Sequence, residues 1–184
     1  MAWTSLTFAF GSVLSSAKMT QLYDNLTAVA QGLSGAQAIS APITGTSTNN
    51  DAAAGIVGEF ISNYTSGVSL TSSVNANCGS ISLTAGDWDV EAIVLYTPAA
   101  STSITITTVA TNNVSATFPT FGTNMQSYVQ HAFHAYVPSL SFTEKTNKTR
   151  YSLSGTTTIY CVVYATFTVS TLTAKAVITA RRVR

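Results

Sequence analysis

Two different periods of hydrophobic residues divide the chain. Near the N-terminus, apolar side chains recur at alternating spacings of three and four, which is the a/d pattern of a coiled-coil seam. The residues of this stripe are Met19, Leu22, Leu26, Val29 and Leu33. From Ile56 onward, apolar and polar residues alternate with the period of two expected of strands with one buried face. The pattern therefore predicts one N-terminal helix followed by a β domain.

The predicted helix extends to about Leu33. Ser15 or Ser16 can cap its start, and Gly32 and Gly35 mark its end. Two heptads do not hold a coiled coil alone, because isolated helices shorter than ~12–15 residues are marginal in water. Three arrangements would cover the stripe: packing on the chain's own β domain, a seam shared between identical chains, or insertion into another protein.

The segment between the helix and the β domain has neither period. Residues 36–55 consist mainly of Gly, Ala, Ser, Thr and Asn, with one Pro. Such a composition is typical of a linker or an extended arm. We therefore divide the chain into a helical anchor or trimerisation segment (residues 1–35), a linker (36–55) and a β domain (56–184).

Two stretches of the β domain show the alternation most clearly. In the first, the residues of the apolar face are Trp88, Val90, Ala92 and Val94. In the second, they are Ile159, Cys161, Val163, Ala165, Phe167 and Val169. Further strands are expected near residues 59–63, 80–84, 104–106, 128–137 and 172–183, which gives about eight in all.

Eight antiparallel strands with no helix between them predict a mainly β fold. The expected architecture is a jelly-roll-like sandwich of two sheets, or a related barrel. The strand at residues 157–170 is fairly apolar on both faces. We therefore expect its outer face to meet a neighbouring subunit, and burial on two sides fits a trimer.

The charge of the chain is low and unevenly distributed. Charged residues make up 8% of the chain, against roughly 25% in average proteins, and Ser and Thr take their place. Lys18 is the one basic residue before residue 141, whereas seven follow it. Four of these seven are scattered, and the pI is about 7.8. We therefore expect no nucleic-acid binding, which normally needs Lys and Arg clustered on one face.

The sequence also indicates where the protein is made. The basic start and apolar run of a secretory signal are not found after Met1, and no stretch approaches the ~18 apolar residues of a membrane span. We therefore expect synthesis in a cytosol and no membrane partner. Cys78 and Cys161 lack metal-ligand spacing, so two buried thiols are expected, with a disulfide formed after release as the alternative.

Candidate catalytic and metal-binding residues form no convincing set. Asp87, Asp89 and Glu91 form an acidic row on one strand face, where we expect a solvated edge rather than a cation site or an acid–base pair. His131 and His134 are three residues apart on a predicted strand, so they face opposite sides and cannot share a metal. Neither a nucleophile motif nor a phosphate-binding loop occurs. We therefore expect no catalytic residue, no cofactor and no metal.

Tyrosines are the remaining candidates for binding. Those of the β domain are Tyr64, Tyr96, Tyr128, Tyr136, Tyr151, Tyr160 and Tyr164. Tyr and Trp on an exposed β surface can stack on sugar rings or anchor a protein interface. Two interpretations stay open: burial in the core or between subunits, and a glycan-binding patch.

Several short motifs, taken in order, resemble small structural proteins of tailed bacteriophages and prophages. At the N-terminus they are Trp3, residues 11–14 (GSVL) and residues 19–25 (MTQLYDN). In the later half they are residues 83–90 (LTAGDWDV), 156–160 (TTTIY), 167–171 (FTVST) and 180–184 (ARRVR). Each motif is short, so the resemblance depends on their order along nearly the whole chain.

The resemblance implies a virion protein made in the cytoplasm of a bacterial host. It would be a homotrimeric head fibre, tail fibre or capsid decoration, with other virion proteins of the capsid or tail as partners. The segment from Trp3 to Leu33 would dock on the particle or seed the trimer. The linker of about 20 residues is shorter than a usual fibre shaft, which favours a compact knob.

Two questions stay open at this point, one about the C-terminal arginines and one about function. Arg181, Arg182 and Arg184 either form salt links to acidic residues of a neighbouring subunit or of the shell, or form a solvated tail. The alternative function is a tail-associated protein that recognises a host surface glycan or protein. Both functions use the same trimeric β knob.

Overall fold

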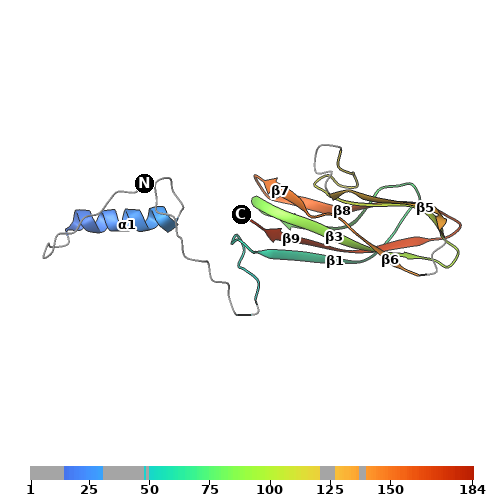
Figure 1. Ribbon diagram of the computed structural model, residues 1–184, viewed down its shortest axis with the longest axis horizontal. Coiled ribbons are helices and arrows are strands. Elements are labelled where there is room, and N and C mark those ends of the chain that lie inside the picture. Colours follow the sequence, from blue (N-terminus) through green and yellow to red (C-terminus); the bar gives the residue numbers. More distant parts are fainter. Residues whose placement is uncertain (1–14, 31–47, 49, 121–126, 137–139) are drawn as a thin grey trace. The chain divides into compact units, whose positions relative to one another are not determined.

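A computed structural model describes residues 15–30, 48, 50–120, 127–136 and 140–184, with the side chains of 28–30 and 133–136 outside this description. The chain divides into two compact units, residues 1–49 and 50–184 (Figure 1). The two units are described separately below. Trp3, Leu33 and most of the predicted linker lie outside the described residues.

The first unit contains the predicted helix, α1, at Ser16–Ala30. Ser15 stands directly before it, and the Lys18 N–H lies 3.4 Å from Ser15 Oγ, the position of an N-cap contact. The helix and its start at Ser15 or Ser16 are therefore confirmed. The glycines predicted to end it, Gly32 and Gly35, lie outside the described residues.

The second unit is built from antiparallel strands. In the described residues these are β1 (Phe60–Ser69), β2 (Ala76–Leu83), β3 (Gly86–Pro98), β4 (Ser103–Asn112), β5 (Val129–Tyr136), β6 (Phe142–Lys145), β7 (Thr149–Leu153), β8 (Thr157–Thr168) and β9 (Leu172–Arg182). The predicted strands are all present, and β1 to β4 are longer than expected. Strands β6 and β7 were not predicted, because they are short and their residues are mostly polar.

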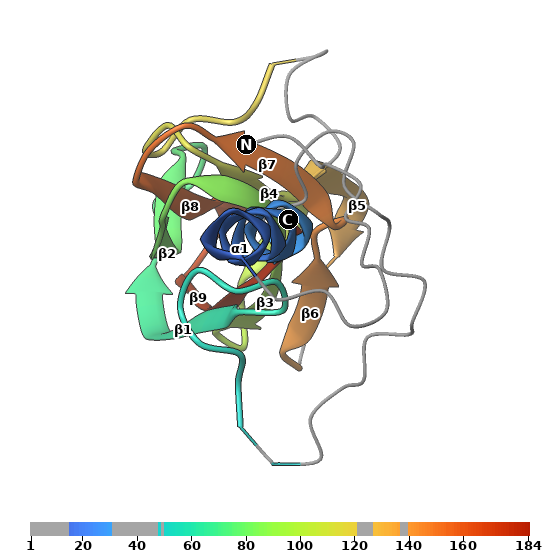
Figure 2. The ribbon, with the colours of Figure 1, turned by 90° about the vertical axis from the view of Figure 1, so that its left-hand side faces the viewer.

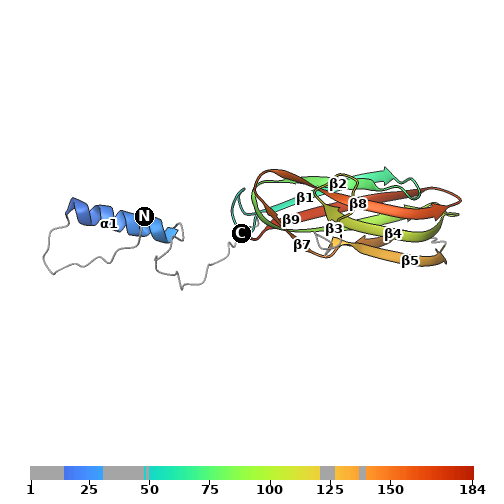
Figure 3. The ribbon, with the colours of Figure 1, turned by 90° about the horizontal axis from the view of Figure 1, so that it is seen from above.

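Two sheets make up this unit. Sheet A has the order β1-β9-β3-β6. Strand β7 lies on the same side of β3 as β6: it pairs with Gly86–Val90 of β3, whereas β6 pairs with Ile93–Tyr96 of β3. Sheet B has the order β2-β8-β4-β5. The sheets form two layers around one hydrophobic core, as in a β-sandwich (Figures 2 and 3). The mainly β, antiparallel fold with one short helix is therefore confirmed.

The alternation of β3 and β8 places the predicted residues in the core. On β3, Trp88, Val90 and Val94 are fully buried and Ala92 nearly so. On β8, the inward residues from Ile159 to Phe167 are buried as well. The prediction is wrong only for Val169, which lies just after β8 with a φ of 78° and an exposed side chain. The positive φ turns the chain away from the strand direction, so the alternation ends there.

Part of the outer face of β8 is covered within its own chain, and the contact with another subunit stays a prediction for the rest of this face. Val162, on this face, is fully buried within its own chain. Its cross-strand partner Asn77 accepts a hydrogen bond from the Ala116 N–H and donates one to Ser115 Oγ, both at 2.7 Å. The connection after β4 therefore lies over this part of sheet B and covers it.

Gly79 allows β2 to pass close to β1. It lies where β2 carries a bulge between Asn77 and Ser80, and its φ is +121°. A Cβ atom at this position would lie 2.7 Å from Thr65 Oγ1 on β1. Backbone conformation and space therefore both require glycine here.

We predict that Gly79→Ala lowers the free energy of unfolding by about 1–3 kcal/mol, the usual cost of a strained backbone position. Urea unfolding followed by circular dichroism measures the change. Gly155→Ala is the matched control, because that glycine has nothing within 4 Å of an added Cβ. Equal stability of the two variants would contradict the close approach of β1 and β2.

Candidate functional site

The acidic row on β3 is not the solvated edge expected from the sequence. Strand β3 lies inside sheet A, between β9 on one side and β6 and β7 on the other. Asp87 is buried, and its Oδ2 lies 2.7 Å from Arg150 Nη2 and 2.8 Å from Arg184 Nη2. Glu91 pairs with Lys145 on β6 at 3.0 Å. Two carboxylates of the row, Asp87 and Glu91, are therefore paired with basic residues from the later part of the chain.

These ion pairs hold Asp87 in its charged form. Hydrogen bonds from Ser152 and Arg150, together with the charges of Arg150 and Arg184, lower the pKa of Asp87 below its ordinary value. Within the described ranges, no group of three or more His, Cys, Asp or Glu side chains could hold a metal ion. The arrangement fits a structural role in joining neighbouring strands.

Arg182 lies at the centre of a buried cluster near the end of β9. Its Nε donates to Glu59 Oε2 at 2.9 Å, its Nη1 to the Ala85 carbonyl at 2.8 Å and its Nη2 to Thr84 Oγ1 at 2.5 Å. The guanidinium also lies 4.3 Å from the ring centroid of Trp88, a cation–π contact. We call these five residues the Arg182 cluster.

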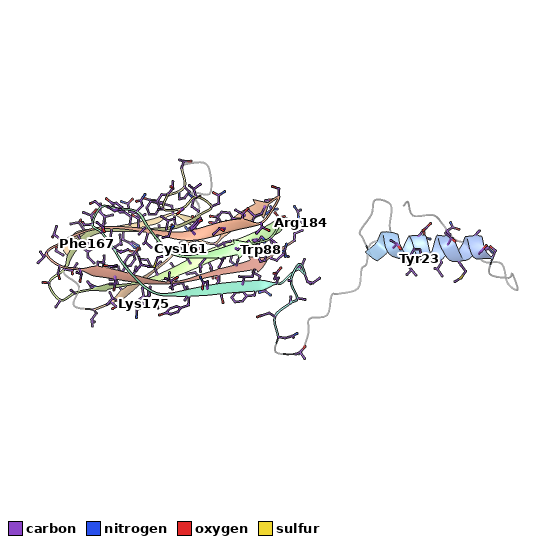
Figure 4. The ribbon with its side chains drawn as sticks, turned by 180° about the vertical axis from the view of Figure 1, so that it is seen from behind. Tyr23, Trp88, Cys161, Phe167, Lys175 and Arg184 are labelled. Atoms are coloured by element: carbon purple, nitrogen blue, oxygen red, sulfur yellow. The ribbon has the colours of Figure 1, made fainter. Side chains whose placement is uncertain are left out.

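The segment before β1 completes this cluster. Glu59 Oε2 also accepts the Gly55 N–H at 2.8 Å, and this bond together with Arg182 lowers the pKa of Glu59. Gly86 has no room for a side chain, because a Cβ there would lie 2.1 Å from Arg182 Nη1. Figure 4 shows Trp88 and Arg184 towards the same end of the sandwich, with Phe167 towards the opposite end.

The three C-terminal arginines therefore have different environments. Arg182 is buried and engaged within its own chain, so neither a salt link to another chain nor a solvated tail describes it. Arg184 is exposed but contacts Asp87. Arg181 is exposed on β9, opposite Asp89 in the register of β3. The hypothesis of a contact with another subunit stays a prediction for Arg181 and Arg184.

Glu144 connects the two sheets at another place. It extends from β6 of sheet A, is buried, and accepts hydrogen bonds at Oε1 from Thr107 on β4 and His131 Nδ1 on β5. The His131 contact measures 2.8 Å, and more than half of the His131 side chain is exposed. Because Thr107 and His131 meet on the same carboxylate oxygen, this trio links β6 of sheet A to β4 and β5 of sheet B.

Both cysteines, Cys78 and Cys161, are buried free thiols in the core. Burial raises the pKa of Cys78 to about 11 and that of Cys161 still further. A thiol in such surroundings carries little thiolate at neutral pH and is a poor nucleophile. Cys161 lies in the middle part of the sandwich in Figure 4.

The apolar stripe of α1 is exposed where the structure describes it. The exposed fractions are 49% for Met19, 40% for Leu22 and 62% for Leu26. Val29 lies in the helix, but its side chain is outside the described set. Exposed large apolar side chains at a/d spacing are typical of a helix that has a partner.

Sheet A carries a second exposed apolar surface on its outer face. Tyr64 on β1, Val177 on β9 and Ile93 on β3 are cross-strand neighbours, with exposed fractions of 59%, 37% and 43%. Together with Leu95, Lys175 and Ala176 they line a shallow hollow of about 280 Å³. We call Tyr64, Ile93 and Val177 the sheet A patch.

The sequence did not identify the Arg182 cluster, the Glu144 contacts or the sheet A patch. Glu59 looked like the first residue of one predicted strand (59–63) and Thr84 like the last residue of another (80–84). A partial signal existed for the patch, because Ile93 is an apolar residue among the outward positions of β3. Cross-strand pairing, which no local pattern reveals, places Tyr64 and Val177 next to it.

We predict that Glu59→Gln lowers the free energy of unfolding at neutral pH by about 1–3 kcal/mol, because it removes the charged partner of a buried guanidinium. The folded-state pKa of Glu59 is lowered from 4.5, so its contribution is present above that value and is lost as the pH falls through the folded-state pKa. The difference from the unmodified protein should therefore shrink in acid.

Urea unfolding at a series of pH values measures this difference. Glu91→Gln is the matched control, because its carboxylate forms a partly exposed pair with Lys145 and should contribute less than about 1 kcal/mol. A Glu59→Gln variant as stable at neutral pH as Glu91→Gln would contradict the structural role of the Arg182 cluster.

Comparison of the sequence with models of protein families and with curated proteins finds no match. Among the described residues, no helix combines the length and the apolar character that crossing a membrane requires. Function must therefore be argued from the chain's own residues, and two features carry that argument: the stripe on α1 and the two outer faces of the sandwich.

Proposed function

We propose that this chain is a non-enzymatic structural protein of a bacteriophage particle, a homotrimeric capsid decoration or head fibre attached through its N-terminal segment. The observation that carries this proposal is the exposed a/d stripe on α1, in a unit separate from the β unit. The ordered motifs that resemble small virion proteins support the bacteriophage context.

The heptad register supports a trimer. With Met19 at an a position, Leu22 is d, Leu26 is a and Val29 is d. Parallel dimers favour a β-branched residue at a with Leu at d, whereas Leu at a with a β-branched residue at d shifts the preference towards three or four chains. The Leu26–Val29 pair has the second order. Three chains also fit the head fibre or capsid decoration proposed above, so the proposed occupant of the stripe is two further copies of the same helix.

The β unit would take the form of a jelly roll. If β6 and β7 count as one interrupted strand beside β3, the unit has two four-stranded sheets. The pairs are then nested: β1 with β9, β2 with β8, β3 with β6 and β7, and β4 with β5. A double-sheet fold of eight antiparallel strands paired in this nested way fits the jelly-roll class.

The sheet A patch would contribute to the interface between subunits. A three-fold interface is heterologous, so the patch of one subunit meets a different surface of the next. Tyr64, Val177 and Ile93 are neighbours across β1, β9 and β3, and the next residue across the sheet is Lys145 on β6, the cross-strand partner of Ile93. An apolar centre with charged residues at its border is the usual composition of a protein interface. Arg181, exposed on the same sheet, would lie at such a border.

We predict that Leu22→Asp combined with Leu26→Asp converts a trimer of 19.2 kDa chains into monomers, because each charge would be buried in the seam of three helices. Sedimentation equilibrium measures the mass. Ala17→Asp with Thr20→Asp is the matched control, since both residues are exposed and occupy f and b positions outside the seam.

The control should remain trimeric. A trimer that persists in the Leu22→Asp, Leu26→Asp variant would contradict the helical seam. A monomeric mass for the unmodified chain would contradict the trimer itself.

A second prediction concerns location. Gold-labelled antibody against this protein should decorate the heads of intact particles in electron micrographs, spread over the shell as a surface appendage. Label confined to the tail would contradict a decoration or head fibre and favour a role in host recognition. Particles without label would contradict a virion protein.

A further inference from the structure

The outer face of sheet B contains a groove that no part of the proposed structural role uses. It has a volume of about 280 Å³ and is lined by Asn75, Ile106, Thr108, Phe118, Tyr128, Gln130 and Tyr164. None of these seven side chains is charged. Ligand sites commonly measure about 300–1,000 Å³, so the groove suits a small ligand or one unit of a larger one.

Strand pairing explains why these residues meet. Thr108 on β4 is the cross-strand partner of both Gln130 on β5 and Tyr164 on β8. Asn75 directly precedes Ala76, whose partner on β8 is Val163, next to Tyr164. One row of side chains therefore runs across sheet B, from Gln130 through Thr108 and Tyr164 towards Asn75.

Aromatic rings form part of the groove. Tyr164 and Tyr128 are half-buried, so part of each side chain remains open to solvent. The Phe118 ring meets that of Tyr128 edge to face, with centroids 5.6 Å apart and an interplanar angle of 78°. Hydroxyl groups of the chain hold the Tyr164 phenol, because Thr166 Oγ1 donates to its oxygen at 3.0 Å. The rings are thus positioned before any ligand binds.

Amide groups supply the polar contacts. The Tyr128 hydroxyl donates to Gln130 Oε1, which leaves the NH₂ group of the exposed Gln130 side chain as a donor. The Asn75 side chain is exposed and makes no hydrogen bond with the described residues. Its amide therefore offers both a donor and an acceptor.

We propose that this groove binds a neutral saccharide. A sugar ring has an apolar face that stacks on an aromatic side chain, and hydroxyl groups at its edge that both donate and accept hydrogen bonds. Tyr164, Tyr128 and Phe118 match the first feature, and Asn75 and Gln130 match the second.

Other ligand classes fit less well. A phosphate-bearing or otherwise anionic ligand would meet no Lys or Arg side chain in the lining. A single nucleic-acid strand needs a basic groove beside its stacking aromatics, which is missing here. A purely apolar ligand would remove Asn75 and Gln130 from water without a hydrogen-bond partner, at a cost in free energy.

A neighbouring hollow indicates that the saccharide has more than one unit. It has a volume of about 320 Å³ and is lined by Asn112, Asn113, Val114, Thr117, Phe118, Pro119 and Thr120. Phe118 borders both hollows, and the second is also free of charged residues. A ligand of two or three sugar units could place one on each side of Phe118.

The test is saturation-transfer NMR on the full chain, with methyl glycosides of glucose, galactose, mannose and N-acetylglucosamine and with the disaccharides maltose and lactose. At least one neutral sugar should receive saturation from the protein, and calorimetry with that sugar then gives its affinity. Glucuronate is the anionic comparison and should bind more weakly. The readout does not depend on the trimer, whose mass is measured separately on the same sample.

Two exposed amides allow variants that keep the fold. Gln130→Ala and Asn75→Ala should each lower the affinity about fivefold or more, as expected for the loss of a hydrogen bond to the ligand. Tyr164→Ala should abolish detectable binding. Tyr160→Ala is the matched control, because Tyr160 lies on the same face of β8 outside the groove and its loss should leave the affinity unchanged.

The outcomes that overturn the proposal are equally specific. The groove is not a saccharide site if none of these sugars receives saturation in the tens of millimolar. The same conclusion follows if glucuronate binds as well as the neutral sugars, or if Gln130→Ala and Asn75→Ala bind as the unmodified chain does. Loss of binding in Tyr160→Ala alone would place the ligand elsewhere on sheet B.

Discussion

The fold of the β unit depends most on the buried guanidinium of Arg182. A charge removed from water is tolerated only when its donors are satisfied, and the partners here come from distant parts of the chain. Glu59 precedes the first strand, Thr84 and Ala85 form the turn before β3, and Arg182 ends the last strand. The cluster can therefore form only when β1, β9 and β3 have paired in the correct register, and a slip by one residue would leave the charge unpaired.

The order of the strands in sheet A accounts for the uneven distribution of charge along the chain. The acidic residues of β3 belong to the first half of the chain, and the strands that flank β3 all come from the basic end. Lys145, Arg150 and Arg184 each pair with Asp87 or Glu91. Charge separated along the sequence is therefore brought together in space, where it joins β3 to its neighbours. A basic C-terminal segment that resembles a binding tail is here a part of one sheet.

The sequence predicted what depends on local pattern and missed what depends on pairing. Alternation identified the buried faces of β3 and β8, and the a/d stripe identified α1. Strands β6 and β7 are too short and too polar to be recognised in this way, so Asp87 looked solvated although Arg150 on β7 covers it. The environment of Arg182 stayed open because its hydrogen-bond partners lie 97 or more residues away. The groove on sheet B joins Asn75, Phe118, Gln130 and Tyr164 from separate segments, which only the strand register brings together.

The two outer faces of the sandwich have different chemistry, and the two proposals assign them different partners. Sheet A offers an apolar patch bordered by charge, which suits another subunit, whereas sheet B offers uncharged amides and aromatic rings. A trimer that covers sheet A leaves three copies of the sheet B groove open. A single sugar unit in a shallow groove binds weakly, because few contacts offset the loss of its freedom. Three linked grooves bind an array of glycans far more tightly than one, since the second and third contacts form at high effective concentration. Weak sites on a stable trimer would therefore suffice for adhesion to a glycan-covered surface.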